Sequence, residues 1–375
     1  MLLSTHAAQV VAETRPTPRL VLWETTQACP LACVHCRANA ISTPDPDELT
    51  TAEGFALIDD LAAVAGPRPV IVFTGGDPLS RPDLLDLIAH AAARGLHVAV
   101  SPAVSERITP ATLTALYDAG ARAISISLDG LGRNHDATRR VPGHALRTLE
   151  ALTMARSVGL RVQVNTTVMR TTVNDLPAVA EAMLARNITT WEVFFLVPTG
   201  RASTELALTA HEHEDVARFL YETTGYGFIV RTVEGPFYRR VADAIATSND
   251  AALAPIGELG ERLIAELHRR LGDPGPRRRP SPHPVRDGDG VIFVSRTGEV
   301  YASGFLPVRL GSVRERSLLD IYASDPLLDA IRQAALPGRC GQCDWAKACG
   351  GSRARAWAIT GDPLADDPAC ALVSA

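Results

Sequence analysis

The stretch LVLWETTQACPLACVHC, residues 20–36, joins an apolar, β-rich run to three closely spaced cysteines. Five more β-rich runs follow along the chain, at 69–75, 96–101, 122–130, 161–168 and 190–198. Between these runs apolar residues recur at helical spacing, as Leu57, Ile58, Leu61 and Val64 do. Strands that alternate with helices of this length predict right-handed βαβ units and a parallel sheet. Since eight units would close a full barrel, the six visible units predict an α/β fold with a partial (βα)6 TIM-like barrel.

The composition is that of an ordinary globular protein. Of the 375 residues, 46% are hydrophobic and 21% are charged, which excludes a disordered or fibrous chain. The formal net charge of −5 gives no global reason to bind nucleic acid. The N-terminus lacks the pattern of a signal peptide, and no apolar run is long enough to span a membrane. We therefore expect a cytoplasmic protein that binds neither nucleic acid nor membrane.

Changes in pattern along the chain divide it into four parts. We expect an N-terminal extension at 1–19, the barrel at 20–200, a helical connection with a Pro/Arg-rich linker at 201–289, and a C-terminal domain at 290–375. The connection carries helical patterns at 211–224, 236–247 and 257–271. The C-terminal domain begins with a predicted hairpin that turns at Thr297–Gly298, followed by a helix near 317–335 and a cysteine-rich tail.

The first three cysteines, Cys29, Cys33 and Cys36, form a C-x3-C-x2-C spacing directly after the first strand. Disulfides are rare in the cytoplasm, so seven cysteines call for another explanation. Three thiolates can hold three irons of a 4Fe–4S cluster and leave the fourth iron open for chemistry. The alternative is a zinc site completed by His35, which is badly placed between two of the ligands. The loop also lies at the face of the predicted barrel where active sites occur.

Three motifs together carry a family resemblance. CPLACVHC (29–36), GGDP (75–78) after the second strand and SLDG (127–130) after the fourth resemble the radical S-adenosylmethionine (SAM) superfamily over residues 20–200. The resemblance implies that the open iron binds the methionine part of SAM, and that reduction of the cluster releases a 5′-deoxyadenosyl radical. That radical removes a hydrogen atom from the substrate.

The same resemblance implies a set of cosubstrate-binding residues. Gly75 and Gly76 allow close backbone approach, and Asp77 of the GGDP motif, followed by Pro78, can accept hydrogen bonds from the methionine ammonium group. The family often has Glu at the position of Asp77. The remaining candidates lie on later strands and the loops that follow them: Ser125, Ser127, Asp129, Asn165 and Val197, with Arg139 or Arg140 for the carboxylate of SAM.

The other four cysteines, Cys340, Cys343, Cys349 and Cys370, are spaced C-x2-C-x5-C with the fourth further on. Four thiolates can hold either zinc or a second 4Fe–4S cluster. The tail resembles the SPASM and twitch extensions of radical SAM enzymes, which implies an auxiliary 4Fe–4S cluster for electron transfer or support. A domain with two auxiliary clusters would need a further cysteine about where Ser303 stands.

The tail further resembles the branch that includes enzymes of alternative heme biosynthesis and enzymes that modify sugar-acid nucleosides. This implies a radical SAM enzyme of oxidoreductase or lyase type that acts on an acidic, carboxylate-bearing small molecule, with decarboxylation as the expected reaction. Its electron donor would be a flavodoxin or ferredoxin. Arg201 is either a carboxylate anchor or a surface arginine, and no catalytic side chain is predicted. The alternatives are modification of a ribosomally made peptide and a non-catalytic iron–sulfur carrier.

One possible metal site is disfavoured. His211 and His213, two residues apart, do not share a helix face, and Thr209 followed by acidic residues predicts a helix start instead.

Overall fold

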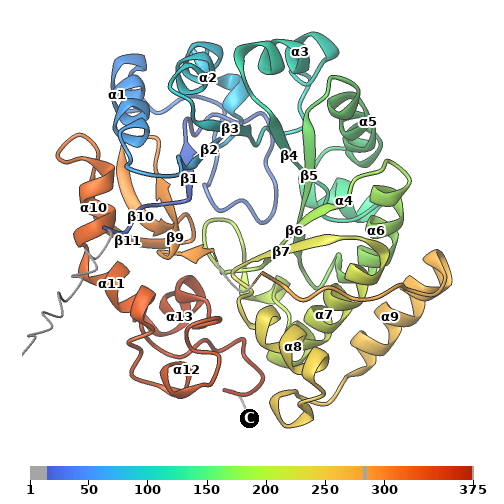
Figure 1. Cartoon of the computed structure of the whole chain (residues 1–375). Coiled ribbons are helices and arrows are strands. Elements are labelled where there is room, and N and C mark those ends of the chain that lie inside the picture. Colours follow the sequence, from blue (N-terminus) through green and yellow to red (C-terminus); the bar gives the residue numbers. More distant parts are fainter. Residues whose placement is uncertain (1–14, 282–284, 374–375) are drawn as a thin grey trace, which may run out of the picture.

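The six predicted strands are all present in the computed structural model, which describes residues 15–281 and 285–373. Most of the predicted extension at 1–19 lies outside these residues. The strands are β1 (Leu20–Glu24), β2 (Val70–Thr74), β3 (His97–Val100), β4 (Ala123–Ser127), β5 (Arg161–Val168) and β6 (Thr190–Phe195). They pair in chain order and all are parallel. Figure 1 shows the sheet curved into a partial barrel with helices around its outside.

The parallel sheet continues beyond the six predicted strands at both ends. β7 (Ile229–Val233) pairs in parallel with β6, and β9 (Gly290–Val294) pairs in parallel with β1. The predicted hairpin follows as β9 and β10 (Glu299–Ser303), and β11 (Leu306–Ser312) completes the edge. Short β8 (Arg286–Asp287) pairs with β9. The hairpin therefore extends the barrel sheet, and β7, in a segment expected to be helical, was not predicted.

Six helices separate the barrel strands: α1 (Thr51–Ala62), α2 (Leu84–Ala93), α3 (Pro110–Ala119), α4 (Gly132–Arg139), α5 (His144–Ser157) and α6 (Leu176–Leu184). Three more follow β6, close to their predicted bounds: α7 (Ala210–Thr223), α8 (Phe237–Thr247) and α9 (Glu258–Leu271). Thr209 and Glu212 form a capping box at the start of α7, which confirms the predicted helix start there.

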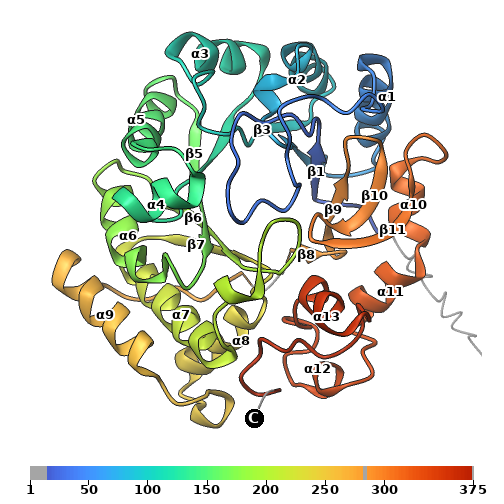
Figure 2. The same ribbon diagram turned by 180° about the vertical axis from the view of Figure 1, so that it is seen from behind.

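The C-terminal helices are shorter than predicted. The helix expected near 317–335 is two helices, α10 (Leu318–Ser324) and α11 (Pro326–Gln333). Asp325 ends the first and caps the second, because Pro326 cannot continue a helix but suits its first turn. The tail then forms α12 (Arg339–Gln342) and α13 (Arg353–Thr360) and lies between α11 and α8 in both views (Figures 1 and 2).

Side-chain alternation along the strands decides what faces the helices and what faces the barrel interior. Ile124 and Ile126 of β4, like Trp191 and Val193 of β6, are buried in the core between sheet and helices. The residues between them therefore point inward, and many are polar. In the described ranges, no helix has the length and apolar character that crossing a bilayer requires.

Candidate active site

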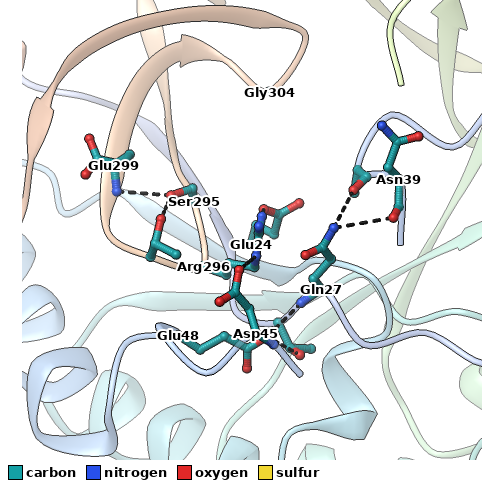
Figure 3. A network of polar contacts seen from close by, with 12 residues as sticks. Glu24, Gln27, Asn39, Asp45, Glu48, Ser295, Arg296, Glu299 and Gly304 are labelled. Carbon is teal, nitrogen blue, oxygen red and sulfur yellow. Dashed lines mark hydrogen bonds and ion pairs between the residues drawn. The ribbon is translucent and has the colours of Figure 1, made fainter. Parts of the chain in front are cut away.

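The three-cysteine loop leaves the carboxyl end of β1 and is fixed by polar contacts at its base. The Cys29 amide donates to the carbonyl of Ile41 at 2.7 Å, and the Gln27 side chain donates to the carbonyls of Ala38 and Asn39. Glu48 accepts hydrogen bonds from the Thr26 hydroxyl and the Gln27 amide at the start of the loop, and from the Asp45 amide near its end. Figure 3 shows the contacts of Gln27 and Glu48 beside the hairpin. The loop is thus held at both ends, as a cluster site requires.

The GGDP segment runs against the start of this loop. The amides of Gly76 and Asp77 donate to the carbonyls of Thr26 and Ala28, both at 2.8 Å. A Cβ added to Gly76 would lie 2.5 Å from the carbonyl oxygen of Ala28. Only glycine permits this approach of two backbones. The two motifs that were separated in sequence therefore form one packed unit.

The Asp77 side chain is turned into the protein. Its carboxylate accepts hydrogen bonds from the Ser105 hydroxyl at 3.0 Å and from the amides of Leu79 and Ala103. The residue is fully buried, and this burial raises its pKa. These contacts tie GGDP to the loop after β3. A contact between Asp77 and the methionine ammonium group stays a prediction. In the structure the Asp77 carboxylate already accepts hydrogen bonds from three protein groups.

Asp129 and Arg139 form a buried ion pair beside the cluster loop. Arg139 Nη2 lies 2.6 Å from Asp129 Oδ2, and Arg139 Nη1 lies 3.6 Å from the sulfur of Cys33. Burial opposes ionisation of Asp129, but the Arg139 guanidinium, two neighbouring histidines and the Thr167 amide together outweigh it and lower the pKa of Asp129 to about 2. Arg140 is exposed instead. The structure thus separates two arginines that sequence left equal, and it gives Asp129 a protein partner.

Three side chains around the loop carry buried nitrogens that have no hydrogen-bond partner within the described residues: His35 Nδ1, Arg139 Nε and Arg201 Nη2. Burial lowers the pKa of His35 to about 4, which leaves a neutral imidazole at pH 7. Unpartnered buried donors are costly unless a ligand accepts from them. An acceptor-rich group such as the carboxylate of SAM fits this requirement, so the loop and its surroundings suit the predicted cosubstrate.

Arg201, which follows β6 in the chain, holds the cysteine loop that follows β1. Its Nε donates to the carbonyl of Cys33 and its Nη1 to the carbonyl of Ala40, both at 2.9 Å. Its own amide donates to the carbonyl of Cys36 at 3.0 Å. These contacts contradict the interpretation of Arg201 as a free surface side chain, whereas its role as a carboxylate anchor stays a prediction. In the sequence, only the position of Arg201 after the sixth strand indicated a role at this site.

The inward face of β4–β6 is polar and internally hydrogen-bonded. Gln163 donates to Asn165 at 2.9 Å, to Glu192 at 3.0 Å and to Ser125 at 3.3 Å. Ser127 lies opposite Asn165 in the register of β4 and β5. The predicted cosubstrate residues on these strands therefore face one space. Their contact with SAM stays a prediction, as does the shelf at Val197, which is buried after β6.

The four C-terminal cysteines line one cavity of about 480 Å³, together with Trp345, Arg240 and Phe237. Burial raises the pKa of Cys340 to about 11 and of Cys349 to about 12. Such thiols ionise readily only next to positive charge, which metal ions supply. The donor set and the cavity fit a multi-iron cluster.

Two buried arginines connect this cavity to the barrel. Arg355 donates to the carbonyl of Glu234 at 2.8 Å, after β7, and pairs with Asp367 at 3.2 Å. The Asp367 amide in turn donates to the sulfur of Cys340 at 3.4 Å. Arg286 of β8 donates to the carbonyl of Cys349 at 3.1 Å. Arg355 therefore fixes the four-cysteine site to the carboxyl end of β7, and Arg286 fixes it to β8 beside the start of β9.

Where a further cysteine would complete a second auxiliary site, the structure has a polar group. Ser303 donates to Glu234 Oε1 at 2.9 Å, and Ser352 donates to Glu234 Oε2 at 2.5 Å. Asp287 is hydrogen-bonded to both Glu234 and Ser303. Sequence reasoning noticed Ser303 but not the carboxyl pair beside it.

The two histidines of α7 are separated as expected. His213 is buried against the rings of Phe195 and Phe237, whereas His211 is exposed.

The chain is similar to one family model and to several curated proteins with different activities. The model of the radical SAM superfamily matches residues 23–183. The "AdoMet-dependent heme synthase" of Nitratidesulfovibrio vulgaris is 34% identical over 372 residues, which cover 97% of this chain and 95% of that protein. The "Fe-coproporphyrin III synthase" of Methanosarcina barkeri is 31% identical, with 99% and 91% covered. The mycofactocin maturase of Mycobacterium tuberculosis is 28% identical, with 95% and 87% covered.

Solved structures show the same fold. The structure described as native anSMEcpe with bound AdoMet superposes with a TM-score of 0.66 at 13% identity and covers 95% of this chain and 94% of that one.

Proposed function

Because this chain belongs to the radical SAM superfamily, we propose that it removes carboxyl groups from a heme precursor by oxidative decarboxylation. The chain is an enzyme that uses SAM and a 4Fe–4S cluster. The observation that carries the proposal is the similarity, over nearly the whole chain, to proteins named for heme and iron coproporphyrin III. Iron coproporphyrin III, an iron porphyrin with propionate side chains, is the substrate we propose.

The chemical balance defines what the protein must provide. A propionate side chain loses one hydrogen atom from the carbon attached to the ring. Its carboxylate then leaves as CO2 while a vinyl double bond forms, and one electron remains to be removed. When bound, the three-cysteine cluster with SAM supplies the 5′-deoxyadenosyl radical for the first step, and a four-cysteine cluster supplies an acceptor for the electron.

The residues of this chain position the reactants. The unpartnered nitrogens of His35, Arg139 and Arg201 belong to residues on or beside the loop that would hold SAM, and they can donate to its carboxylate. The polar wall of β4–β6 offers hydrogen bonds to the nucleoside and substrate. Arg355 fixes the ends of β6 and β7 to the tail, so that the two cysteine sites keep fixed positions relative to each other.

An anaerobic assay tests the proposal. Reconstituted protein is mixed with dithionite, SAM and iron coproporphyrin III, and 5′-deoxyadenosine, CO2 and porphyrin mass are measured. We expect porphyrin products that have lost CO2 and two hydrogens per side chain, and no product from the variant with Cys29, Cys33 and Cys36 changed to Ala.

Other outcomes would support the alternatives. Cleavage of SAM with the porphyrin unchanged contradicts decarboxylation of this substrate and favours another substrate, such as a peptide. Iron without cleavage of SAM, with or without porphyrin, favours an iron–sulfur carrier. An electron donor such as flavodoxin or ferredoxin is expected to replace dithionite.

A further inference from the structure

Arg231 lies on the inward face of β7, in the strand that sequence reasoning did not predict. Backbone register aligns Ser127 with Asn165, Asn165 with Glu192, and Glu192 with Arg231, across β4 to β7. Aligned residues of parallel strands point to the same side of a sheet. The Arg231 side chain confirms this direction, because its Nη1 reaches Gln163 Oε1 on β5 at 3.3 Å.

The guanidinium of Arg231 is largely unsatisfied. The long contact with Gln163 is its one hydrogen bond within the described residues, and no carboxylate there forms an ion pair with it. Glu192, its neighbour in the register, accepts a hydrogen bond from Gln163, and burial raises the pKa of Glu192 against the opposing charge of Arg231. Arg231 is also exposed. An exposed arginine on the inner wall that has free donors, and no ion-pair contact within the described residues, can bind an anionic ligand.

The other arginines near the cluster loop are already engaged. Arg139 pairs with Asp129, and Arg201 holds the backbone of the loop. Arg37 and Arg296 both pair with Glu24 at the end of β1, as Figure 3 shows for Arg296. Each of these arginines would have to give up a partner in order to bind a substrate. Arg231 would not.

The distance between Arg231 and Asn165 suits a second ligand that binds beside SAM. Neighbouring strands are about 4.8 Å apart, so the Arg231 backbone lies roughly 10 Å from Asn165, which is proposed to contact SAM. Arg161 of β5 also points inward and is exposed, but it precedes Asn165 by four residues, about 13 Å toward the amino ends of the strands. Arg231 is therefore the better placed of the two exposed arginines.

We infer that Arg231 anchors a carboxylate of the substrate, an inference that rests on the proposed function. A bidentate guanidinium–carboxylate contact would fix one acidic side chain of the substrate and orient the molecule against the cosubstrate. Gln163 and Glu192 position the guanidinium from the neighbouring strands. Arg231 is a binding residue, and its loss affects substrate affinity before it affects cleavage of SAM.

Binding titrations separate this role from a structural one. Iron coproporphyrin III and its tetramethyl ester, which lacks carboxylates, are titrated into cluster-loaded protein and followed by the porphyrin absorption band. We expect Arg231→Gln to weaken binding of the acid by about tenfold or more, as for the loss of one charge-assisted hydrogen bond. Binding of the ester and cleavage of SAM without substrate should not change. Arg231→Lys should recover part of the affinity, and Arg161→Gln is the matched control.

The outcomes distinguish the inference from the function on which it rests. Turnover of the porphyrin with equal binding by wild type and Arg231→Gln overturns the inference alone. The same holds if Arg161→Gln weakens binding as much, since general charge attraction would then explain both. Binding that depends on Arg231 without decarboxylation overturns the proposed function alone. If the wild type binds no porphyrin acid, both are wrong.

Discussion

Glu234, the residue after β7, is hydrogen-bonded to Asp287 of β8 and so joins the two ends of the parallel sheet. β7 pairs with β6 at one end, and β8 pairs with β9 at the other. Two carboxyl groups can share a hydrogen bond only if one of them holds a proton. The open side of the barrel is therefore bridged by an acid pair rather than by a strand pair.

This pair should make the stability of the protein depend on pH. Burial and the neighbouring charges of Glu234 and Glu192 raise the pKa of Asp287 well above its ordinary value. The folded protein thus keeps a proton that the unfolded chain loses above about pH 4, and stability should fall as pH rises from there through the folded pKa.

Asp287→Asn should flatten this dependence, because the amide donates to Glu234 at every pH. The measurement is the midpoint of thermal unfolding of cluster-loaded protein between pH 5 and 8. Asp118→Asn, at an exposed position of α3, is the control and should leave the wild-type slope intact. An unchanged slope in Asp287→Asn would show that the pair carries no such proton.

Gly200→Ala should impair the three-cysteine site. Gly200 has a φ of 62°, and an added Cβ would lie 2.4 Å from the carbonyl oxygen of Cys36. The loop must shift to remove this clash, so iron content and cleavage of SAM should fall together. Gly227→Ala, at a φ of 90° but with no atom within 4 Å, isolates the backbone strain. Equal losses in both variants would mean that the contact with the loop is unimportant.

Arg139→Gln should destabilise the protein by about 3–5 kcal/mol in urea unfolding, because it leaves the buried carboxylate of Asp129 without its partner. The double variant Asp129→Asn/Arg139→Gln should lose less than the sum of the two single variants, since no unpaired charge remains. Arg140→Gln, at the exposed neighbour, should stay within about 0.5 kcal/mol of wild type. Strict additivity would argue against a coupled pair.

Cys343→Ser should separate the two cysteine sites. The variant is expected to lose about four of roughly eight iron atoms and to keep cleavage of SAM, since the three-cysteine loop is distant in sequence and held by its own contacts. Decarboxylated product should disappear, because the electron acceptor is gone. Cys33→Ser should lose both cleavage and product. Zinc in the wild-type tail, found by elemental analysis, would contradict the auxiliary cluster.

The local pattern of the chain was sufficient to predict much of the fold. Strand and helix periods, the Thr209 cap and the Thr297–Gly298 turn depend on neighbours in sequence, and all were predicted closely. The C-x3-C-x2-C loop after a strand also indicated the cluster chemistry, because ligand type and spacing are local properties. β7 was missed because its edge position gives it exposed residues and weak alternation.

Sequence by itself determined the order of strands, the two groups of cysteines and the family. Only the tertiary structure decided which side chains come into contact around the three-cysteine loop. Arg201 and Cys33 are 168 residues apart yet hydrogen-bonded, and Arg139, not Arg140, reaches the cluster loop. Such contacts depend on how strands from distant segments align in the curved sheet, and no local pattern encodes that alignment.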